Sequence, residues 1–364
     1  RIGPGLITGA ADDDPSGIAT YSQAGAQFGY SLLWTTVLTT PLMIGIQLAS
    51  ARIGFATGRG IGANLRRVYA RRAAIALVAL LLIANTVNVA ADLAAMGDAV
   101  ELLVGGPQHL YSVGFGVLCV LLQVLFSYRR YVRVLKWLTV SLLAYVAVAF
   151  SVAVPWGEVA WSIVWPQVQW NASFWMVVVG VLGTTISPYL FFWQASLEAE
   201  EMRGNHEAEH LRSSRRFAAE HLYRIKLDTM IGMVFSNVIA FAIMLSAAAA
   251  RRANGITDVS TSAQAAQALR PIAGEFSFVL FAAGIIGTGL LAVPVLAGSA
   301  AYALSDALEL PASIDLKLRQ AREFYAIIVL ATAIGAALNF TRIDPMQALV
   351  GAAVLNGLIA VPIM

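Results

Sequence analysis

Ten apolar runs dominate the chain, and short polar stretches separate each run from the next. About 20 apolar residues are enough to cross the hydrocarbon core of a bilayer as an α-helix. The pattern therefore predicts an all-α integral membrane protein with a single transmembrane domain over residues 1–364. The runs cover residues 3–26, 31–53, 74–97, 111–127, 134–155, 173–197, 227–250, 275–305, 324–340 and 345–364.

The composition agrees with a protein that lies in a membrane. Hydrophobic residues make up 59% and charged residues 12% of the chain, and the mean hydropathy is +0.72, whereas soluble domains carry about 25% charged residues. The net charge of +3 comes from loop arginines, so we expect no nucleic-acid partner and no cofactor. The single cysteine, Cys119, excludes an intramolecular disulfide and a multi-cysteine metal site.

Lysine and arginine are distributed unevenly between the predicted loops. Nineteen lie in the loops after even-numbered runs, and four lie in the loops after odd-numbered runs. Because cytoplasmic loops carry the excess of positive charge, the pattern predicts a multi-pass protein of the cell (inner) membrane with a cytoplasmic N-terminus. The sequence does not fix the oligomeric state, and a monomer is sufficient.

The longest charged loop, residues 199–226, mixes acids, bases and three histidines. This mixture predicts a solvated amphipathic helix on the inner surface. His206 and His210 are four residues apart, a spacing that can ligate a metal. A regulatory metal site is therefore the alternative interpretation of this loop.

The first apolar run contains Asp12, Asp13 and Asp14, followed by Pro15. Acidic side chains inside a membrane are costly and usually line a cavity or an ion path. Proline removes a backbone donor and interrupts a helix. The run therefore predicts two half-helices, with Asp14 as the cap of the second half and Pro15 at its first position.

The sixth apolar run is interrupted in a similar way at Ser187-Pro188. Each interruption falls in the first span of a five-span block, and interrupted spans at corresponding positions indicate an inverted-repeat transporter. The repeats would cover residues 1–155 and 173–364, with opposite orientations because five is odd. For Pro188 taken alone, an ordinary helix kink is the alternative.

Two facing breaks of this kind predict a cation site. Unwound turns free carbonyl oxygens, and helix C-terminal ends point negative dipoles at the gap. Asp14 adds a full negative charge, Thr184 or Thr185 a carbonyl or hydroxyl, and Ser187 a hydroxyl. All of these are hard oxygen ligands.

Four segments near the N-terminus form a recognisable pattern, namely Gly3-Pro-Gly5, Asp14-Pro15-x-x-Ile-Ala-Thr20, Gln23–Tyr30 and Leu33-Trp34. They resemble the first span and following loop of the NRAMP divalent-metal transporters. The resemblance covers the whole visible chain, with weaker support from Asp92, Ser236-Asn237 and Asn356. It implies a LeuT-type fold, with broken first and sixth helices and a metal site between them to which Asn237 and Asn356 also contribute.

The chain departs from the family pattern at the positions that decide selectivity. Gly17 stands where the family has an asparagine ligand, and Ser187 where it has methionine. Of the two family histidines, Tyr189 replaces the first and Gln194 the second. Ala95 replaces the glutamate that partners Asp92. We keep Gly17 in the predicted metal site and expect Tyr189, Gln194, Asp92, Asp12 and Asp13 to line the pathway or couple transport.

These replacements predict a particular ion. Without a thioether the remaining oxygen ligands suit Mg²⁺, Ca²⁺ and Mn²⁺, and Mg²⁺ usually retains several waters. The sequence thus predicts a secondary transporter or facilitator for partly hydrated Mg²⁺, with Mn²⁺ also carried, similar to the NRAMP-related magnesium transporters. Loss of the histidines and the glutamate predicts weak or absent proton coupling.

Three other functions were weighed. The first is the usual proton-coupled Mn²⁺/Fe²⁺ importer, and the second is a transporter of an organic cation or an amino acid. The third is an intramembrane aspartyl hydrolase, which needs two converging carboxylates, such as Asp14 and Asp92. Asp12 and Asp13 are interpreted either as an outer ring for a hydrated ion or as water-facing solubilising groups. Asp92 shares a helical face with Asn85 and Asn88, which predicts either a polar exit lining or interhelical hydrogen bonds.

Overall fold

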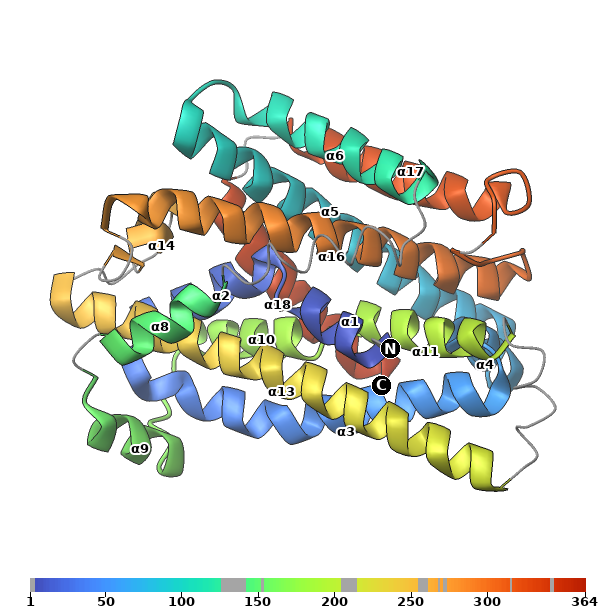
Figure 1. The fold of residues 1–364 in the computed structure, drawn as a ribbon, viewed down its shortest axis with the longest axis horizontal. Coiled ribbons are helices and arrows are strands. Elements are labelled where there is room, and N and C mark those ends of the chain that lie inside the picture. The colour runs from blue at the N-terminus through green and yellow to red at the C-terminus, as the bar shows by residue number, and fades with distance from the viewer. Residues whose placement is uncertain are drawn as a thin grey trace.

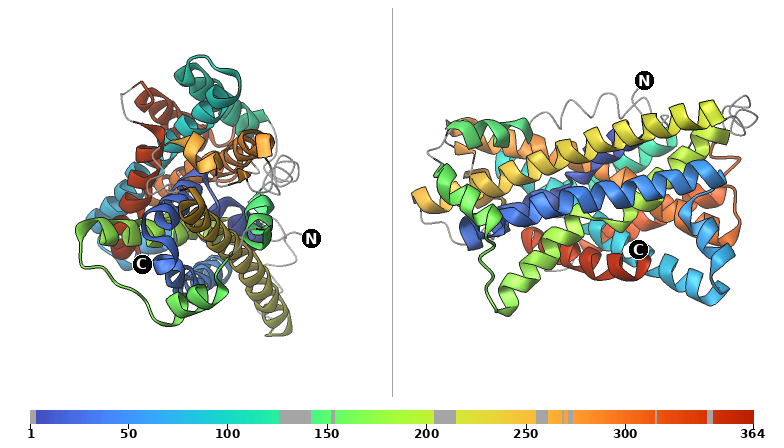
Figure 2. Two further views of the ribbon diagram at one scale, coloured as in Figure 1. Left: turned by 90° about the vertical axis from the view of Figure 1, so that its left-hand side faces the viewer. Right: turned by 90° about the horizontal axis from the view of Figure 1, so that it is seen from below.

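The computed structural model describes residues 4–125, 142–151, 154–203, 215–254, 261–267, 269–270, 274–314, 316–340 and 344–364. These residues form helices and connecting turns, and the described ranges contain no β-strand. The longest helices run roughly along the long axis of the molecule (Figures 1 and 2). The all-α prediction is confirmed.

The first predicted break lies between α1 (Pro4–Asp12) and α2 (Pro15–Phe28). Asp14 has an extended backbone, with φ −74° and ψ 169°, and its side chain accepts a hydrogen bond from the backbone N–H of Gly17. It thereby satisfies one of the free donors at the start of α2. Both the capping role of Asp14 and the position of the proline are confirmed.

The second predicted break lies between α10 (Ala172–Thr185) and α11 (Pro188–Arg203). Asn171 caps α10 by accepting a hydrogen bond from Phe174 N at 2.8 Å. The two breaks are linked directly, because the hydroxyls of Tyr21 on α2 and Thr185 on α10 lie 2.9 Å apart. The chain therefore holds two split helices in contact at the centre of the bundle (Figure 1).

Long helices surround the split pair. The layer of α5, α6, α16 and α17 packs on one side of α1 and α2, and α3 and α13 lie on the other (Figures 1 and 2). The remaining elements are η1 (Gly29–Leu32), α3 (Leu33–Thr57), α4 (Ile61–Val68), α5 (Arg71–Val104), α6 (Gln108–Leu125), α8 (Leu143–Ser151), α9 (Trp156–Val164), α13 (Arg215–Asn254), α14 (Ser262–Gln267), η3 (Gly274–Phe276), α16 (Ser277–Leu308), α17 (Arg322–Leu338) and α18 (Pro345–Ile363).

Seven helical segments of the described chain are long and apolar enough to cross a membrane, or eight if the bent pair α8 and α9 counts as one span. The first of these joins α2 to α3 across η1. The ninth predicted run forms α17, which has 17 residues. The fifth predicted run, 134–155, lies partly outside the described residues. The boundaries of the two predicted repeats stay a prediction.

Apolar and polar side chains are distributed as a bilayer requires. Large apolar side chains such as Val37 and Leu42 are about half exposed on the outer surface, where lipid would cover them. Asp12, Asp14 and Asp92 are at most 1% exposed in the interior. Acids placed inside a bundle in this way mark a functional site.

The prediction for residues 199–226 is confirmed only in part among the described residues: 215–226 are helical, with Glu220, Arg224 and Lys226 exposed and Ile225 buried, but the helix is not a separate surface element. α11 continues to Arg203, and α13 begins at Arg215, so both ends of the loop extend membrane helices. His221 stacks on Phe55, with ring centroids 4.7 Å apart, and is not solvated. The charged residues of this stretch face neighbouring helices as well as water. His206 and His210 lie outside the described residues.

Candidate functional site

The Asp14 carboxylate is fixed in place at the first break. Its Oδ1 accepts hydrogen bonds from Ser16 Oγ and Gly17 N, both at 2.7 Å. Its Oδ2 has one weak partner, the Tyr189 hydroxyl at 3.4 Å. No ion pair in the described part of the chain involves Asp14, so hydrogen bonds alone compensate this buried charge. The role of Ser16 was missed, although a serine two residues after a capping aspartate is a usable signal.

Gly17 leaves room for two oxygens beside that carboxylate. A Cβ at Gly17 would lie 3.1 Å from Thr184 Oγ1 and 3.4 Å from Asp14 Oδ1. Thr184 Oγ1 is buried and has no hydrogen-bond partner among the described residues. Thr185 donates to Val181 O and contacts Tyr21. Of the two predicted threonines, Thr184 is therefore the one with a free hydroxyl.

Ser187 serves the turn that ends α10. Its hydroxyl lies 2.9 Å from both Gly183 O and Thr184 O and donates to these carbonyls. The hydroxyl proton is thus used locally, and only the oxygen lone pairs remain for a cation.

Tyr189 joins the two breaks. Its hydroxyl lies 3.1 Å from Ala11 O, at the end of α1, and 3.4 Å from Asp14 Oδ2. The residue sits on the first turn of α11 and is fully buried. Tyr189 therefore lies at the gap, as its predicted pathway role requires.

Asp12 and Asp13 lie on either side of Ser236 from α13. The Ser236 hydroxyl is 2.5 Å from Asp12 Oδ2 and 3.1 Å from Asp13 Oδ1. Both carboxyl groups are buried, with 1% and 3% exposure. The interpretation that they are water-facing solubilising groups is therefore wrong.

Asp92 brings a further carboxyl group toward the gap from α5. Both of its oxygens are buried and accept no hydrogen bond of standard geometry from the described residues, and the groups that act on it are the Asp14 carboxylate and the backbone amide of Ser16 on α2. The two asparagines on the same helix face make interhelical hydrogen bonds, from Asn85 to Leu296 O at 2.9 Å and from Asn88 to Asn356 at 2.8 Å. They are structural, whereas Asp92 approaches Asp14 and the Ser16 backbone at the start of α2.

Asn237 and Asn356 both make contacts with other helices. Asn237 Nδ2 is directed at Met43 Sδ on α3, 3.1 Å away, and its Oδ1 is buried without a hydrogen-bond partner among the described residues. Asn356 Oδ1 accepts the hydrogen bond from Asn88. Their ligand roles, which the resemblance implies, stay predictions, and the Asn356 oxygen is already engaged.

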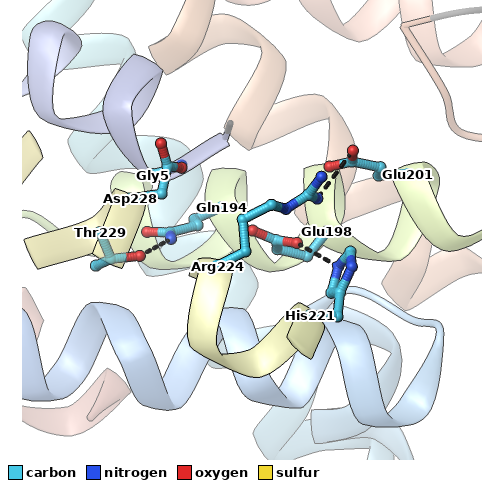
Figure 3. Close-up of polar contacts among 8 residues, drawn as sticks. All are labelled: Gly5, Gln194, Glu198, Glu201, His221, Arg224, Asp228 and Thr229. Carbon is cyan, nitrogen blue, oxygen red and sulfur yellow. Dashed lines mark hydrogen bonds and ion pairs between the residues drawn. The ribbon is translucent and has the colours of Figure 1, made fainter. Parts of the chain in front are cut away.

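Gln194 lies away from the gap, in a polar seam between α11 and α13 (Figure 3). Its Nε2 donates to Thr229 Oγ1 at 2.8 Å. Farther along the seam, Glu201 forms an ion pair with Arg224 at 3.0 Å. The remaining contacts are Glu198 with His221 at 3.8 Å and Gly5 N with Asp228 Oδ2 at 2.7 Å. This seam holds α1, α11 and α13 together.

The side chains at the gap form a sparse, hard site. No group of three or more His, Cys, Asp or Glu residues converges on one point in the described ranges. A cation at the gap would be held by one carboxylate together with hydroxyls, carbonyls and water. Such ligands suit Mg²⁺, Ca²⁺ and Mn²⁺.

Comparison with known proteins shows which family this chain belongs to. The family described as Natural resistance-associated macrophage protein-like (Nramp) matches residues 5–364. A divalent metal cation transporter MntH from Yersinia enterocolitica is 31% identical over 297 residues, which cover 79% of this chain and 68% of that protein. The MntH of Pectobacterium carotovorum is 29% identical over 297 residues with the same coverage.

Solved structures show the fold. An Eremococcus coleocola manganese transporter in complex with a bis-isothiourea compound has a TM-score of 0.73 and 18% identity, over 99% of this chain and 77% of that one. Mhp1, a nucleobase-cation-symport-1 family transporter, has a TM-score of 0.62 and 14% identity with the same coverage. The chain therefore has the LeuT-type fold, and it belongs to the Nramp family of membrane transporters, which are not enzymes.

Proposed function

We propose that this protein moves a divalent metal cation across the membrane and binds it where the two broken helices meet. The observation that carries the proposal is the Asp14 carboxylate, which has one oxygen fixed and the other beside the gap. Thr184 adds a buried hydroxyl without a partner in the described chain. A buried charge is costly unless an opposite charge compensates it, and a divalent cation supplies that charge.

Mn²⁺ is the first candidate substrate. Two relatives are named divalent metal cation transporters, and a solved neighbour is a manganese transporter. Carboxylate, carbonyl and water ligands suit Mn²⁺. These names give no support to a magnesium branch and favour the usual importer over the Mg²⁺ facilitator expected from the sequence.

Mg²⁺ is retained as a second candidate because of one observation. The side chains proposed as ligands (Asp14, Thr184 and Ser187) offer only oxygen, without the thioether that favours softer metals. Mg²⁺ uptake that saturates and is competed by Mn²⁺ would support this candidate. Mn²⁺ uptake that is unaffected by excess Mg²⁺ would remove it.

The usual importer of the family couples metal entry to proton entry. In this chain Tyr189 and Gln194 stand in place of the two family histidines, which predicts weak proton coupling. A pH dye inside proteoliposomes separates the two. Acidification during Mn²⁺ entry supports the coupled importer. Entry driven by the membrane potential alone, worth about 2.3 kcal/mol per charge per 100 mV, supports the facilitator.

Uptake of Mn²⁺ by the Asp14→Asn variant in proteoliposomes tests the proposal. We expect uptake to fall to the level of protein-free liposomes. Glu158→Gln is the matched control, because it also removes one negative charge. Glu158 forms an exposed ion pair with Arg252, and exposed ion pairs contribute little to folding stability. Uptake by Asp14→Asn equal to that of the parent would contradict the proposed site. The cytoplasmic N-terminus proposed from the arginine distribution is testable by protease protection.

A further inference from the structure

Polar groups continue from the gap along the contact between α11 and α16. The Ser299 hydroxyl of α16 donates to Tyr189 O at 2.8 Å, and the Tyr302 hydroxyl donates to Glu200 Oε1 at 2.6 Å. Ser299, Tyr302 and Asp306 are three and four residues apart, which places them on one face of α16. This face carries polar groups from the gap toward the end of the helix.

A pocket of about 480 Å³ opens where this contact ends. It lies among the ends of α3, α4, α11 and α16, at the end of the bundle that the arginine distribution predicts to be cytoplasmic. Its lining includes two acids and two bases. The lining residues are Thr57, Gly58, Arg59, Ala63, Met202, Arg203, Asp306, Glu309 and Leu310.

Asp306 lies at the boundary between this pocket and the interior. It lines the pocket, but its Oδ2 is buried and has no hydrogen-bond partner in the described structure. Ser196 Oγ, on α11, is likewise buried without a partner among those residues. A Cβ on Gly60 would lie 2.3 Å from Asp306 Oδ2 and 2.7 Å from Ser196 Oγ. The glycine therefore leaves room for two oxygens that converge without any contact that satisfies them.

The packing of α4 on α16 accounts for only some of the polar contacts near Asp306. The Asp306 carboxylate interacts with the backbone amide of Ala63 in the first turn of α4. In return Arg66 donates to Ala307 O and pairs with Glu309, both at 3.0 Å. These contacts hold the two helix ends together but leave Asp306 Oδ2 and Ser196 Oγ unused.

The charge around Asp306 favours a cation over an anion. Arg59 and Arg203 are exposed side chains, so water and salt screen their charges. The Asp306 oxygen is buried, and Asp306 takes part in no ion pair in the described part of the chain. Arg203 and Arg59 stabilise the Asp306 carboxylate electrostatically, but because both are exposed and screened, the buried carboxylate attracts a metal ion more strongly than these guanidinium groups attract an anion.

We infer that Asp306 and Ser196 form a second, weaker binding station for the transported divalent cation, between the gap and the pocket. The inference rests on the proposed function. Ser299 and Asp306 are seven residues apart, about 10 Å along the helix, so the station is separate from Asp14. The edge contact of Trp193 with Tyr302, at 5.8 Å, lies between them.

Titration of purified protein with Mn²⁺, followed by the electron paramagnetic resonance of free Mn²⁺, tests this station. In the Asp14→Asn variant, which lacks the central site, we expect one weak site to remain. Adding Asp306→Asn should raise its dissociation constant at least about tenfold, because asparagine keeps an acceptor for Ala63 but loses the charge. Adding Ser196→Ala instead should raise it about threefold. Adding Glu309→Gln is the matched control in the same pocket and should leave it unchanged.

The outcomes separate this inference from the proposed function. Mn²⁺ uptake retained by Asp14→Asn would overturn the proposed central site, and absence of Mn²⁺ uptake by the parent protein would overturn the proposed function. The second station alone would be overturned if the Asp14→Asn protein bound Mn²⁺ with the same dissociation constant after Asp306→Asn or Ser196→Ala was added to it. Binding of inorganic phosphate in place of Mn²⁺ by the Asp14→Asn protein would assign the pocket to its arginines and also overturn the inference.

Discussion

Replacing Gly17 with alanine tests the geometry of the gap with a single added methyl group. The new Cβ would lie 3.1 Å from Thr184 Oγ1 and 3.4 Å from Asp14 Oδ1. The first distance is shorter than ordinary contact, so the Thr184 hydroxyl must shift or rotate. A side chain forced about 30° from its rotamer costs about 0.5–1.5 kcal/mol, and alanine gains up to about 1 kcal/mol over glycine inside a helix.

These two contributions nearly cancel, so the fold stability of Gly17→Ala should stay within about 1 kcal/mol of the parent. The cation site should change more. If the Thr184 hydroxyl is a ligand, its displacement should raise the KM for Mn²⁺ about tenfold, equivalent to about 1.4 kcal/mol. Mn²⁺ uptake in proteoliposomes and thermal unfolding in detergent measure the two quantities separately.

Gly45→Ala is the matched control, because nothing lies within 4 Å of a Cβ at that position of α3. It should unfold at the same temperature as the parent or higher and transport Mn²⁺ with unchanged KM. A KM of Gly17→Ala within about twofold of the parent value would mean that Thr184 does not face the bound cation, and would exclude its hydroxyl as a ligand.

Three further changes test the packing around the gap. Ser236→Ala removes the hydroxyl between two buried carboxyl groups and should lower the free energy of unfolding by about 1–3 kcal/mol; unaltered denaturant unfolding would contradict this. Gly9→Ala would place a Cβ 2.4 Å from the backbone of α13, so the yield of folded protein should collapse, while Gly351→Ala, with nothing within 4 Å, should express normally. Tyr21→Phe removes the hydroxyl contact between α2 and α10 and should cost about 1 kcal/mol of stability, with uptake retained if the link is only structural.

The two helix breaks were predictable because their causes are local. A proline inside an apolar run interrupts a helix wherever it lies, and Asp14 caps the turn that follows it. The fold class could be predicted because two such breaks, one in each half of the chain, indicate an inverted-repeat transporter. The long helices could be predicted from the length of the apolar runs alone.

Which side chains can act as ligands depends on contacts between segments that are distant in the chain, and the sequence pattern does not reveal these contacts. Thr184 and Thr185 look alike in the chain, and the Tyr21 contact decides which hydroxyl is free. Ser236 lies 223 residues from Asp13, and its contact with the two acids was not predicted.

The part of the prediction for residues 199–226 that is wrong has a related origin. Their charges suggest a surface helix, but Glu198 and Glu201 face His221 and Arg224 across the seam between α11 and α13 (Figure 3). Charged residues that pair between helices give the same local pattern as residues that face water. The Asp306 and Ser196 pair was missed for the same reason, because only packing brings α11 and α16 together.

Locating bound Mn²⁺ by its anomalous X-ray scattering tests the central claim most directly. We expect a peak between the two broken helices, within coordination distance of Asp14 Oδ2 and next to Thr184 Oγ1, and its loss in crystals of Asp14→Asn. A peak that lies elsewhere in the bundle, or one that persists unchanged in Asp14→Asn, would contradict it.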